Sequence, residues 1–324
     1  MTEALARERI LKLKAEIERL RFAYHVHNAP GVTDDVYESL MRELHALEEK
    51  FPQFAVSESL NRIAGKPLDK FRKVTHSSRM LSLQDAFGAE ELYAWEKRVK
   101  KLLEGKPYRY FAELKLDGLA VNLRYEQGVF VQGATRGDGF VGEDITENIK
   151  VIGDIPLRLL PPYPQHIEVR GEVVMQKSVL ERLNKEQEEK GLPKFANTRN
   201  AAAGSVRQLD PSIAQSRQLS FFAYDIAVLQ GAQKIPEFHS EEHALLRELG
   251  FPVTSQECVA KTLPEIETFI AAIGEEREHL PYHIDGIVVQ VDELSLHDRL
   301  GVVGKAPRYA VAFKYPAERA TTMV

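Results

Sequence analysis

Apolar residues near the start of the chain recur at three- and four-residue steps, the period of an amphipathic helix. The first stripe ends before the turn 28–31 and consists of Ile10, Leu13, Ile17, Leu20 and Tyr24. Thr33 can cap a second helix, whose stripe ends before Phe51 and consists of Tyr37, Leu40, Met41, Leu44 and Leu47. The pattern predicts a helical N-terminal domain over residues 1–70.

The period changes to two from Tyr108 onward, which indicates strands. The predicted strands are 108–116, 119–125, 128–134, 166–175, 219–228, 284–292 and 308–314. Helical patterns fall between them at 89–104, 177–190, 240–249 and 264–277. Short neighbouring strands joined by tight turns favour antiparallel pairing. We therefore predict an α+β domain of mainly antiparallel sheets with flanking helices over residues 71–317, and the start of a linker over 318–324.

Composition narrows the class without defining a function. The formal net charge of −5 gives no overall attraction for nucleic acid, so any polyanion must be held by local basic groups. Cys258 is the only cysteine, which excludes an internal disulfide and a multi-cysteine zinc site. The charged N-terminus is unlike a signal peptide, and no apolar run is long enough to span a bilayer. These features predict a cytoplasmic protein with no membrane partner.

The segment Glu113-Leu114-Lys115-Leu116-Asp117-Gly118 places charged groups at the end of a predicted strand. Alternation puts Glu113 and Lys115 on one face, with Asp117 following. Taken alone, such a triplet is more often a solvated ion pair than a site. Other charged groups strengthen the interpretation as a functional site, because charged side chains on apolar strands are costly unless they are paired or used. They are Glu168, Arg170, Glu172, Asp285 and Lys314, with Arg136 at the glycine-rich turn 135–139.

These charged groups and their neighbours occur in the order found in covalent nucleotidyltransferases. Several longer stretches are specific to one family within that superfamily. The sequence resembles the bacterial NAD-dependent DNA ligases over nearly its whole length. The resemblance is carried by Lys115-Leu116-Asp117-Gly118, Glu172, Tyr224 within 221–224, Asp285-Gly286-Ile287-Val288-Val289, Lys314, Met80-Leu81-Ser82-Leu83, Thr135-Arg136-Gly137-Asp138-Gly139, the run 195–211, and Tyr24, His25, Asp34 and Tyr37.

The resemblance implies a mechanism in which Lys115 attacks the α-phosphorus of NAD, keeps AMP and releases nicotinamide mononucleotide (NMN). This is the first step in sealing nicks in duplex DNA. Lys115, Asp117, Asp285 and Lys314 are then the catalytic residues, with Asp285 orienting Lys115 or holding Mg²⁺. The implied ligands of NAD in this domain are Ser82, Leu83, Glu113 at the adenine edge, Arg136, Glu172 at the ribose, Tyr224 stacked on adenine, and Gln290.

The helical domain would account for the use of NAD. By resemblance, Tyr24 and Tyr37 sandwich the nicotinamide ring, while His25, Asp34 and Glu38 bind the rest of the NMN half. Without the resemblance, core packing is the preferred reading for both tyrosines, since each continues an apolar stripe. Arg199, Arg207 and Arg277 match positions that the family uses on nicked DNA; their alternative is a solvated surface, and for Arg277 a helix-surface ion pair.

Three departures from the family qualify these expectations. Gln290 stands where the family motif has lysine, and we expect this to slow adenylation by removing a cation from the α-phosphate. Glu38 stands where aspartate is more common, which we expect to matter little. The chain ends at Val324, so we expect a fragment without the oligonucleotide-binding fold or the zinc module of the full ligases.

Two alternatives stay open at this point. One is an ATP- or GTP-using nucleotidyltransferase, such as an RNA ligase or a capping enzyme. The other is a nucleotide-binding module whose adenylation is lost through Gln290. In each case we expect a monomer. A dinucleotide dehydrogenase is disfavoured, since no Gly-x-Gly-x-x-Gly follows a strand and opens a helix.

Overall fold

The computed structural model describes residues 70–315 and scattered positions between 3 and 54. Among the scattered positions, Ile10, Leu13 and Ile17 pack with Leu44 and Leu47 in one buried cluster. These residues come from both predicted apolar stripes, so the stripes pack against each other. The domain boundary near residue 70 stays a prediction.

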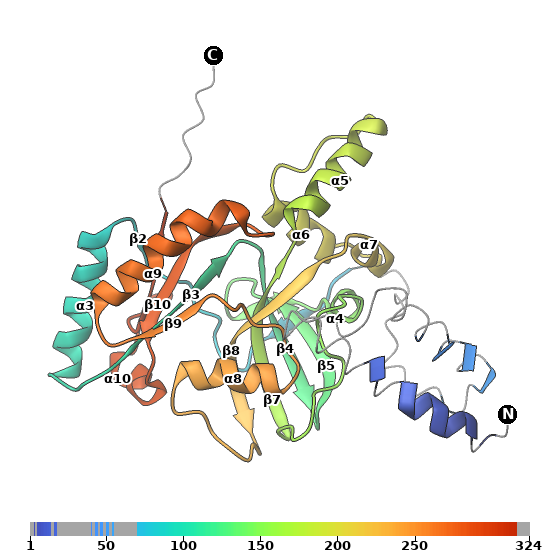
Figure 1. Ribbon diagram of the computed structural model, residues 1–324, viewed down its shortest axis with the longest axis horizontal. Helices are drawn as coiled ribbons and strands as arrows, with labels where there is room; N and C mark the ends of the chain where they lie inside the picture. Colours follow the sequence, from blue (N-terminus) through green and yellow to red (C-terminus); the bar gives the residue numbers. More distant parts are fainter. Residues whose placement is uncertain are drawn as a thin grey trace.

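Two larger sheets form the body of residues 70–315 (Figure 1). The four-stranded sheet has the order β5-β4-β7-β8, and all of its pairs are antiparallel. Its strands are β4 (Leu119–Glu126), β5 (Val129–Thr135), β7 (His166–Val174) and β8 (Ser220–Gln230). The fold is α+β, as predicted.

The five-stranded sheet has the order β2-β13-β10-β3-β9. Its strands are β2 (Asp85–Ala86), β3 (Tyr110–Leu116), β9 (Glu257–Ala260), β10 (Ile284–Val291) and β13 (Ala310–Lys314). β2 and β13 run parallel, and the other pairs are antiparallel. Two short pairs lie outside these sheets: β1 (Lys73–Thr75) with β6 (Val141–Glu143), and β11 (Val302–Val303) with β12 (Ala306–Pro307).

Each large sheet has its own apolar core. Helices α3 (Ala89–Leu103) and α9 (Leu263–Glu276) pack on the five-stranded sheet through residues such as Trp95 and Ile266. The four-stranded sheet packs against α4 (Thr146–Lys150), α5 (Lys177–Glu189), α6 (Thr198–Val206) and α8 (His239–Glu248), with Phe221 and Phe251 in the centre of that core. Helix α7 (Pro211–Ser216) packs against α4 and α6. Near the C-terminal end lie α10 (His297–Leu300) and the 3₁₀ turns η3 (Arg277–His279) and η4 (Leu294–Leu296).

A segment that we call the strap, residues 78–86, contacts both sheets. Arg170 on β7 donates hydrogen bonds from Nη2 to the carbonyl oxygens of Ser78 and Arg79, at 2.9 and 3.0 Å. At the other end, the amide of Ala312 on β13 donates to the carbonyl of Gln84 at 2.8 Å, and β2 extends the sheet. The strap therefore joins the two sheets across the space between them.

No helix among the described residues has the length and apolar character needed to cross a bilayer.

Candidate active site

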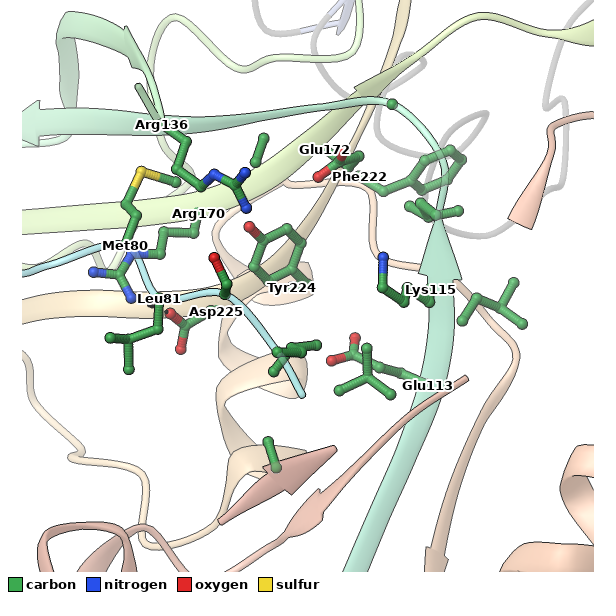
Figure 2. A pocket seen from close by; sticks show the side chains of 18 of the residues that line it. Met80, Leu81, Glu113, Lys115, Arg136, Arg170, Glu172, Phe222, Tyr224 and Asp225 are labelled. Atoms are coloured by element: carbon green, nitrogen blue, oxygen red, sulfur yellow. Dashed lines mark hydrogen bonds and ion pairs between the residues drawn. The ribbon is translucent and has the colours of Figure 1, made fainter. Parts of the chain in front are cut away.

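A cavity of about 640 Å³ lies between the two sheets, with the strap along one wall. Figure 2 shows Glu113, Lys115, Glu172 and Tyr224 pointing into this common space from strands of both sheets. Eleven of the predicted site residues line it: Ser82, Leu83, Glu113, Lys115, Arg136, Glu172, Arg199, Tyr224, Asp285, Gln290 and Lys314. The cavity is large enough for a ligand the size of a nucleotide.

Two lysines share one carboxylate at one end of the cavity. Lys115, near the end of β3, donates from Nζ to Asp285 at 3.1 Å. Lys314, the last residue of β13, donates to Oδ2 of the same carboxylate, and its Nζ lies 3.9 Å from Asp85. Strand register explains the meeting, because Gly286 pairs with both Lys115 and Lys314. We call this group the lysine end.

Glu172 on β7 lies in the cavity wall at the same end. Burial raises the pKa of Glu172 to about 8, although Lys115, Arg199 and Arg136 favour its charged form. The chain between β3 and β4 passes close by: a Cβ at Gly118 would lie 2.2 Å from the carbonyl oxygen of Val173. The glycine in the Lys115 motif thus permits the close approach of β3 and β7 that puts Lys115 near Glu172.

The other end of the cavity has Glu113 at its floor, only 5% exposed. Nε2 of His239 lies 3.7 Å from Oε1 of Glu113, and Nε2 of His243 lies 3.4 Å from Oε2. Both histidines are on α8, four residues apart and hence on one helix face. Asp292 fixes the start of that helix by accepting from the amide of Ser240 at 2.8 Å. We call this group the histidine end.

Charge pairing dominates the electrostatics of the histidine end. Burial by itself would raise the pKa of Glu113, but the nearby imidazoles of His243 and His239 outweigh it and lower the pKa to about 2. Burial likewise opposes protonation of the two imidazoles, yet the neighbouring carboxylates raise the pKa of both. Glu113 is therefore an anion that can accept hydrogen bonds from a ligand.

Tyr224 on β8 lies between these two ends in the cavity wall (Figure 2). Burial, assisted by the Glu172 carboxylate, raises the pKa of Tyr224, so its hydroxyl stays protonated. Beside it, Arg170 pairs with Asp225 at 3.1 Å and is held by the strap. The tyrosine ring thus presents a fixed apolar surface to the cavity.

The position of Gln290 changes one expectation. Gln290 on β10 pairs with Phe111, whereas Lys115 pairs with Gly286 at the opposite end of the register. Four residues of strand separate the two positions, about 13 Å along the sheet. The Phe111 ring packs against both His239 and His243, at centroid distances of 5.1 and 4.8 Å. Gln290 therefore lies at the histidine end, and the expectation that its side chain replaces a cation beside the attacked phosphate is not supported.

Three predicted residues do not line the cavity. Asp117 accepts from Arg199 at 3.2 Å, which places this pair beside the cavity mouth because Arg199 lines it. Arg207 forms a two-point ion pair with Glu143, at 2.7 and 3.1 Å. Arg277 ends α9, lies 3.5 Å from Glu278 and stacks over the ring of Tyr315. The predicted NMN ligands Tyr24, His25, Asp34, Tyr37 and Glu38 lie outside the described residues.

Sequence reasoning missed the second layer of the histidine end. His239 and His243 were not predicted as site residues, although the spacing His-x-x-x-His at the start of a helix is a recognisable signal; the helix was predicted from residue 240, one position after His239. Asp225, His297 and Tyr309 also line the cavity, and the rings of His297 and Tyr309 stack at 3.8 Å. No spacing rule links these residues, because distant segments bring them together.

Covalent nucleotidyl transfer requires an amine nucleophile next to a second cation, and the lysine end provides both beside a cavity that can hold a nucleotide. Comparison with known families makes this specific. A family model described as the NAD-dependent DNA ligase adenylation domain matches residues 68–318, and one described as the DNA ligase-like N-terminal NAD⁺-binding domain matches residues 3–61. The chain belongs to the NAD-dependent DNA ligase family, as its motifs indicated.

The curated relatives support this assignment over the whole chain. The DNA ligase of Brevibacillus brevis is 49% identical over 325 residues, which cover 100% of this chain and 48% of that protein. The DNA ligase of Pelotomaculum thermopropionicum is 46% identical, covering 100% and 49%. The chain thus spans about half the length of these relatives. Among solved structures, the ligase domain of M. tuberculosis LigD matches 72% of this chain and 60% of that one, with 14% identity and a TM-score of 0.37.

Proposed function

We propose that this chain transfers AMP from NAD to the amine of Lys115. The observation that carries the proposal is the lysine end, where Lys115 and Lys314 share the Asp285 carboxylate inside the cavity. The amine attacks the α-phosphorus, a nitrogen–phosphorus bond forms, and the bond from that phosphorus to the departing NMN oxygen breaks. AMP stays on Lys115 and NMN leaves with the electron pair of the broken bond.

The amine must lose a proton before it can attack. Lys314 lies beside the same carboxylate, and its cation stabilises the negative charge that develops on the phosphoryl oxygens. Asp285 holds both amines and so sets the direction from which Lys115 attacks.

The rest of the cavity suits the nucleotide. We assign Glu113 to accept from the adenine amino group, Tyr224 to stack on the base and Glu172 to bind the ribose. This order follows the cavity from the histidine end to the lysine end. Arg136 offers its cationic side chain near Glu172. Gln290 is assigned to the base edge, since it lies beside Phe111.

Mg²⁺ fits this arrangement. The donor set at the lysine end includes the oxygen atoms of Asp285 and Asp85, and Mg²⁺ is bound in many sites by one or two carboxylates together with substrate phosphates. We assign Asp285 as the principal protein ligand. The ion would supply further neutralisation of phosphate charge.

Intact mass spectrometry tests the proposal directly. Incubation with NAD and Mg²⁺ should add the mass of one AMP group, and Lys115→Ala should abolish the addition. ATP in place of NAD should give no adduct; an adduct from ATP alone would favour an ATP-using nucleotidyltransferase. Thermal stabilisation by NAD without an adduct at any time would instead indicate a nucleotide-binding module.

The activity of the whole ligase extends the proposal to DNA. We propose that the full-length protein is a cytoplasmic monomer that seals nicks in duplex DNA during replication and repair. Arg199 and Arg207, with side chains about half exposed, are assigned to the DNA phosphates, and Arg277 to the same surface. Both exposed arginines now pair with carboxylates, so DNA would have to replace Asp117 and Glu143 as their partners.

A further inference from the structure

The histidine end contains a ligand set that adenine recognition alone does not require. Glu113, His239 and His243 each direct one potential metal-ligand atom to a common point, with these atoms all within 4.8 Å of one another. Their side chains are 7, 4 and 0% exposed. A carboxylate would be enough to accept from a purine amino group, and it would need no pair of imidazoles behind it.

The outer nitrogens of both imidazoles are held by further carboxylates. Nδ1 of His239 lies 2.7 Å from Glu242, and Nδ1 of His243 lies 2.8 Å from Glu257. Arg247 in turn donates to Glu257 at 2.7 Å. Metal-binding histidines in proteins are almost always oriented in this way, with the second ring nitrogen donating to a carboxylate or a carbonyl. The arrangement directs both Nε2 atoms toward Glu113.

The ligand atoms lie close to the spacing that a tetrahedral ion needs. Zinc–nitrogen and zinc–oxygen bonds of about 2.0–2.2 Å place neighbouring ligand atoms about 3.3–3.5 Å apart. Nε2 of His239 lies 3.7 Å from Oε1 of Glu113 and Nε2 of His243 lies 3.4 Å from Oε2, and one ligand atom from each residue lies within 4.8 Å of the others, so side-chain movements would bring the three atoms to this spacing. Nε2 of His239 is buried and has no hydrogen-bond partner within the described residues. Nε2 of His243 is 3.1 Å from the carbonyl oxygen of Tyr224, a contact that an ion would replace.

We propose that Glu113, His239 and His243 bind a divalent transition-metal ion of the Zn²⁺ class. Glu113 and His239 line the cavity, so the fourth position of the ion would face the ligand space. Two imidazoles and one carboxylate with an open fourth position favour Zn²⁺ over Mg²⁺, which prefers oxygen ligands in an octahedron. This site is separate from the Asp285 carboxylate to which Mg²⁺ is assigned.

The consequence for the enzyme rests on the proposed function. Bound Zn²⁺ would occupy the acceptor atoms of Glu113 and so compete with the adenine of NAD. Zn²⁺ should therefore raise the apparent KM for NAD in the adenylation reaction without lowering the rate at saturating NAD. Mg²⁺ at the same concentration should produce no such competition.

Calorimetric titration of the nucleotide-free chain with ZnCl₂ tests the site independently of catalysis, with Co²⁺ as a spectroscopic probe of tetrahedral binding. One equivalent should bind to the parent chain. His239→Gln and His243→Gln should each weaken binding by at least the factor of about 10–100 that is typical for loss of an outer partner. Glu242→Gln, which changes only that outer partner of His239, should weaken it within that range. Cys258→Ser is the matched control and should bind like the parent.

The folded state of each variant is checked by its thermal unfolding without metal. Failure of the parent chain to bind Zn²⁺, or unchanged binding in Glu242→Gln and both histidine variants, would overturn the metal site. If Zn²⁺ binds as expected but NAD does not compete with it, the site stands and the assignment of adenine to the histidine end is wrong. Absence of the AMP adduct when zinc-free protein is incubated with NAD and Mg²⁺ would count against the proposed function alone.

Discussion

The two ends of the cavity each place a glutamate among basic groups, with opposite results. Glu113 is enclosed by two imidazoles, and its pKa falls to about 2. Glu172 has Lys115, Arg199 and Arg136 nearby, and its pKa nevertheless rises to about 8 because burial dominates. Enclosed, directly paired charge is therefore stable at the histidine end, whereas the lysine end keeps its charges incompletely paired. Direct pairing thus keeps a buried glutamate ionised, whereas burial that outweighs the nearby cations keeps it protonated.

Replacing Glu113 should have the largest effect on folding. Glu113→Ala leaves two buried imidazoles without their shared acceptor, and breaking a buried charge pair in this way costs about 3–5 kcal/mol. Denaturant unfolding near pH 7 measures the loss. Glu267→Ala is the surface control, since its partner Tyr93 is exposed, and it should change stability by less than about 1 kcal/mol. Equal losses in the two variants would mean that the histidine end is not held by charge pairing.

Replacing Asp285 should act on the reaction more than on the fold. Asp285→Asn leaves Lys115 and Lys314 without a common anion, so the attacking amine is no longer fixed. Misplacement of a reacting group by about 1 Å can cost on the order of a hundredfold in rate. Single-turnover formation of the AMP adduct measures it. A rate within twofold of the parent would show that Asp285 does not position the amine.

Replacing Glu172 should change how stability depends on pH. The pKa of Glu172 is about 8 in the fold and near its ordinary 4.5 in the unfolded chain, so the folded state holds the extra proton between these values. Stability from this group is complete below pH 4.5 and is lost as pH rises toward 8, by up to about 1.4 kcal/mol per pH unit.

Glu172→Gln removes that dependence because the amide does not ionise. Unfolding free energies of the parent and the variant, measured from pH 5 to 9, should therefore diverge as pH rises, with the variant gaining relative stability. Parallel curves would exclude Glu172 as the group that titrates. Glu113 predicts the reverse sign, since its lowered pKa gives stability that is lost only as pH falls from 4.5 toward 2.

Gln290→Lys should have the smallest effect and should separate the two ends most finely. Because position 290 lies beside Phe111 at the histidine end, the lysine should change the apparent KM for NAD by up to about tenfold, the effect of one hydrogen bond. The adduct-forming rate at saturating NAD should stay within twofold. A faster adduct-forming rate at saturating NAD would instead mean that the side chain at position 290 acts at the attacked phosphate.

Periodicity alone predicted the main strands and the longer helices to within a few residues. The strand predicted at 284–292 is observed at Ile284–Val291, and the helix predicted at 177–190 at Lys177–Glu189. The elements that were not predicted are short or lack an apolar stripe. Helix α6 is one example: its start depends on the Asn197 side chain, which accepts from the amide of Asn200. A single hydrogen bond of this kind leaves no period in the sequence.

The predicted site divides along similar lines. Lys115, Asp285 and Lys314 were found because family motifs mark them, and strand register then brings them together. The motif did not predict that Gln290 lies four strand positions from the residue paired with Lys115, because a motif gives the order of residues but not their distance along a sheet. His239 reaches the cavity only through the placement of α8 beside β3, a tertiary contact that no local pattern contains.

The strap also has a consequence for how the protein is made. Arg79 in the strap donates to the carbonyl of Gly304, 225 positions further along the chain. The carbonyl of Gln84 accepts from the amide of Ala312, which is also made late. A ribosome adds residues from the N-terminus at about 5–20 per second, so roughly ten seconds or more pass before these partners can meet. The four-stranded sheet can form well before then, since its last strand ends at Gln230. During synthesis the wall of the cavity that belongs to the four-stranded sheet can thus form first. The cavity is complete only when β13 has been made, together with Lys314.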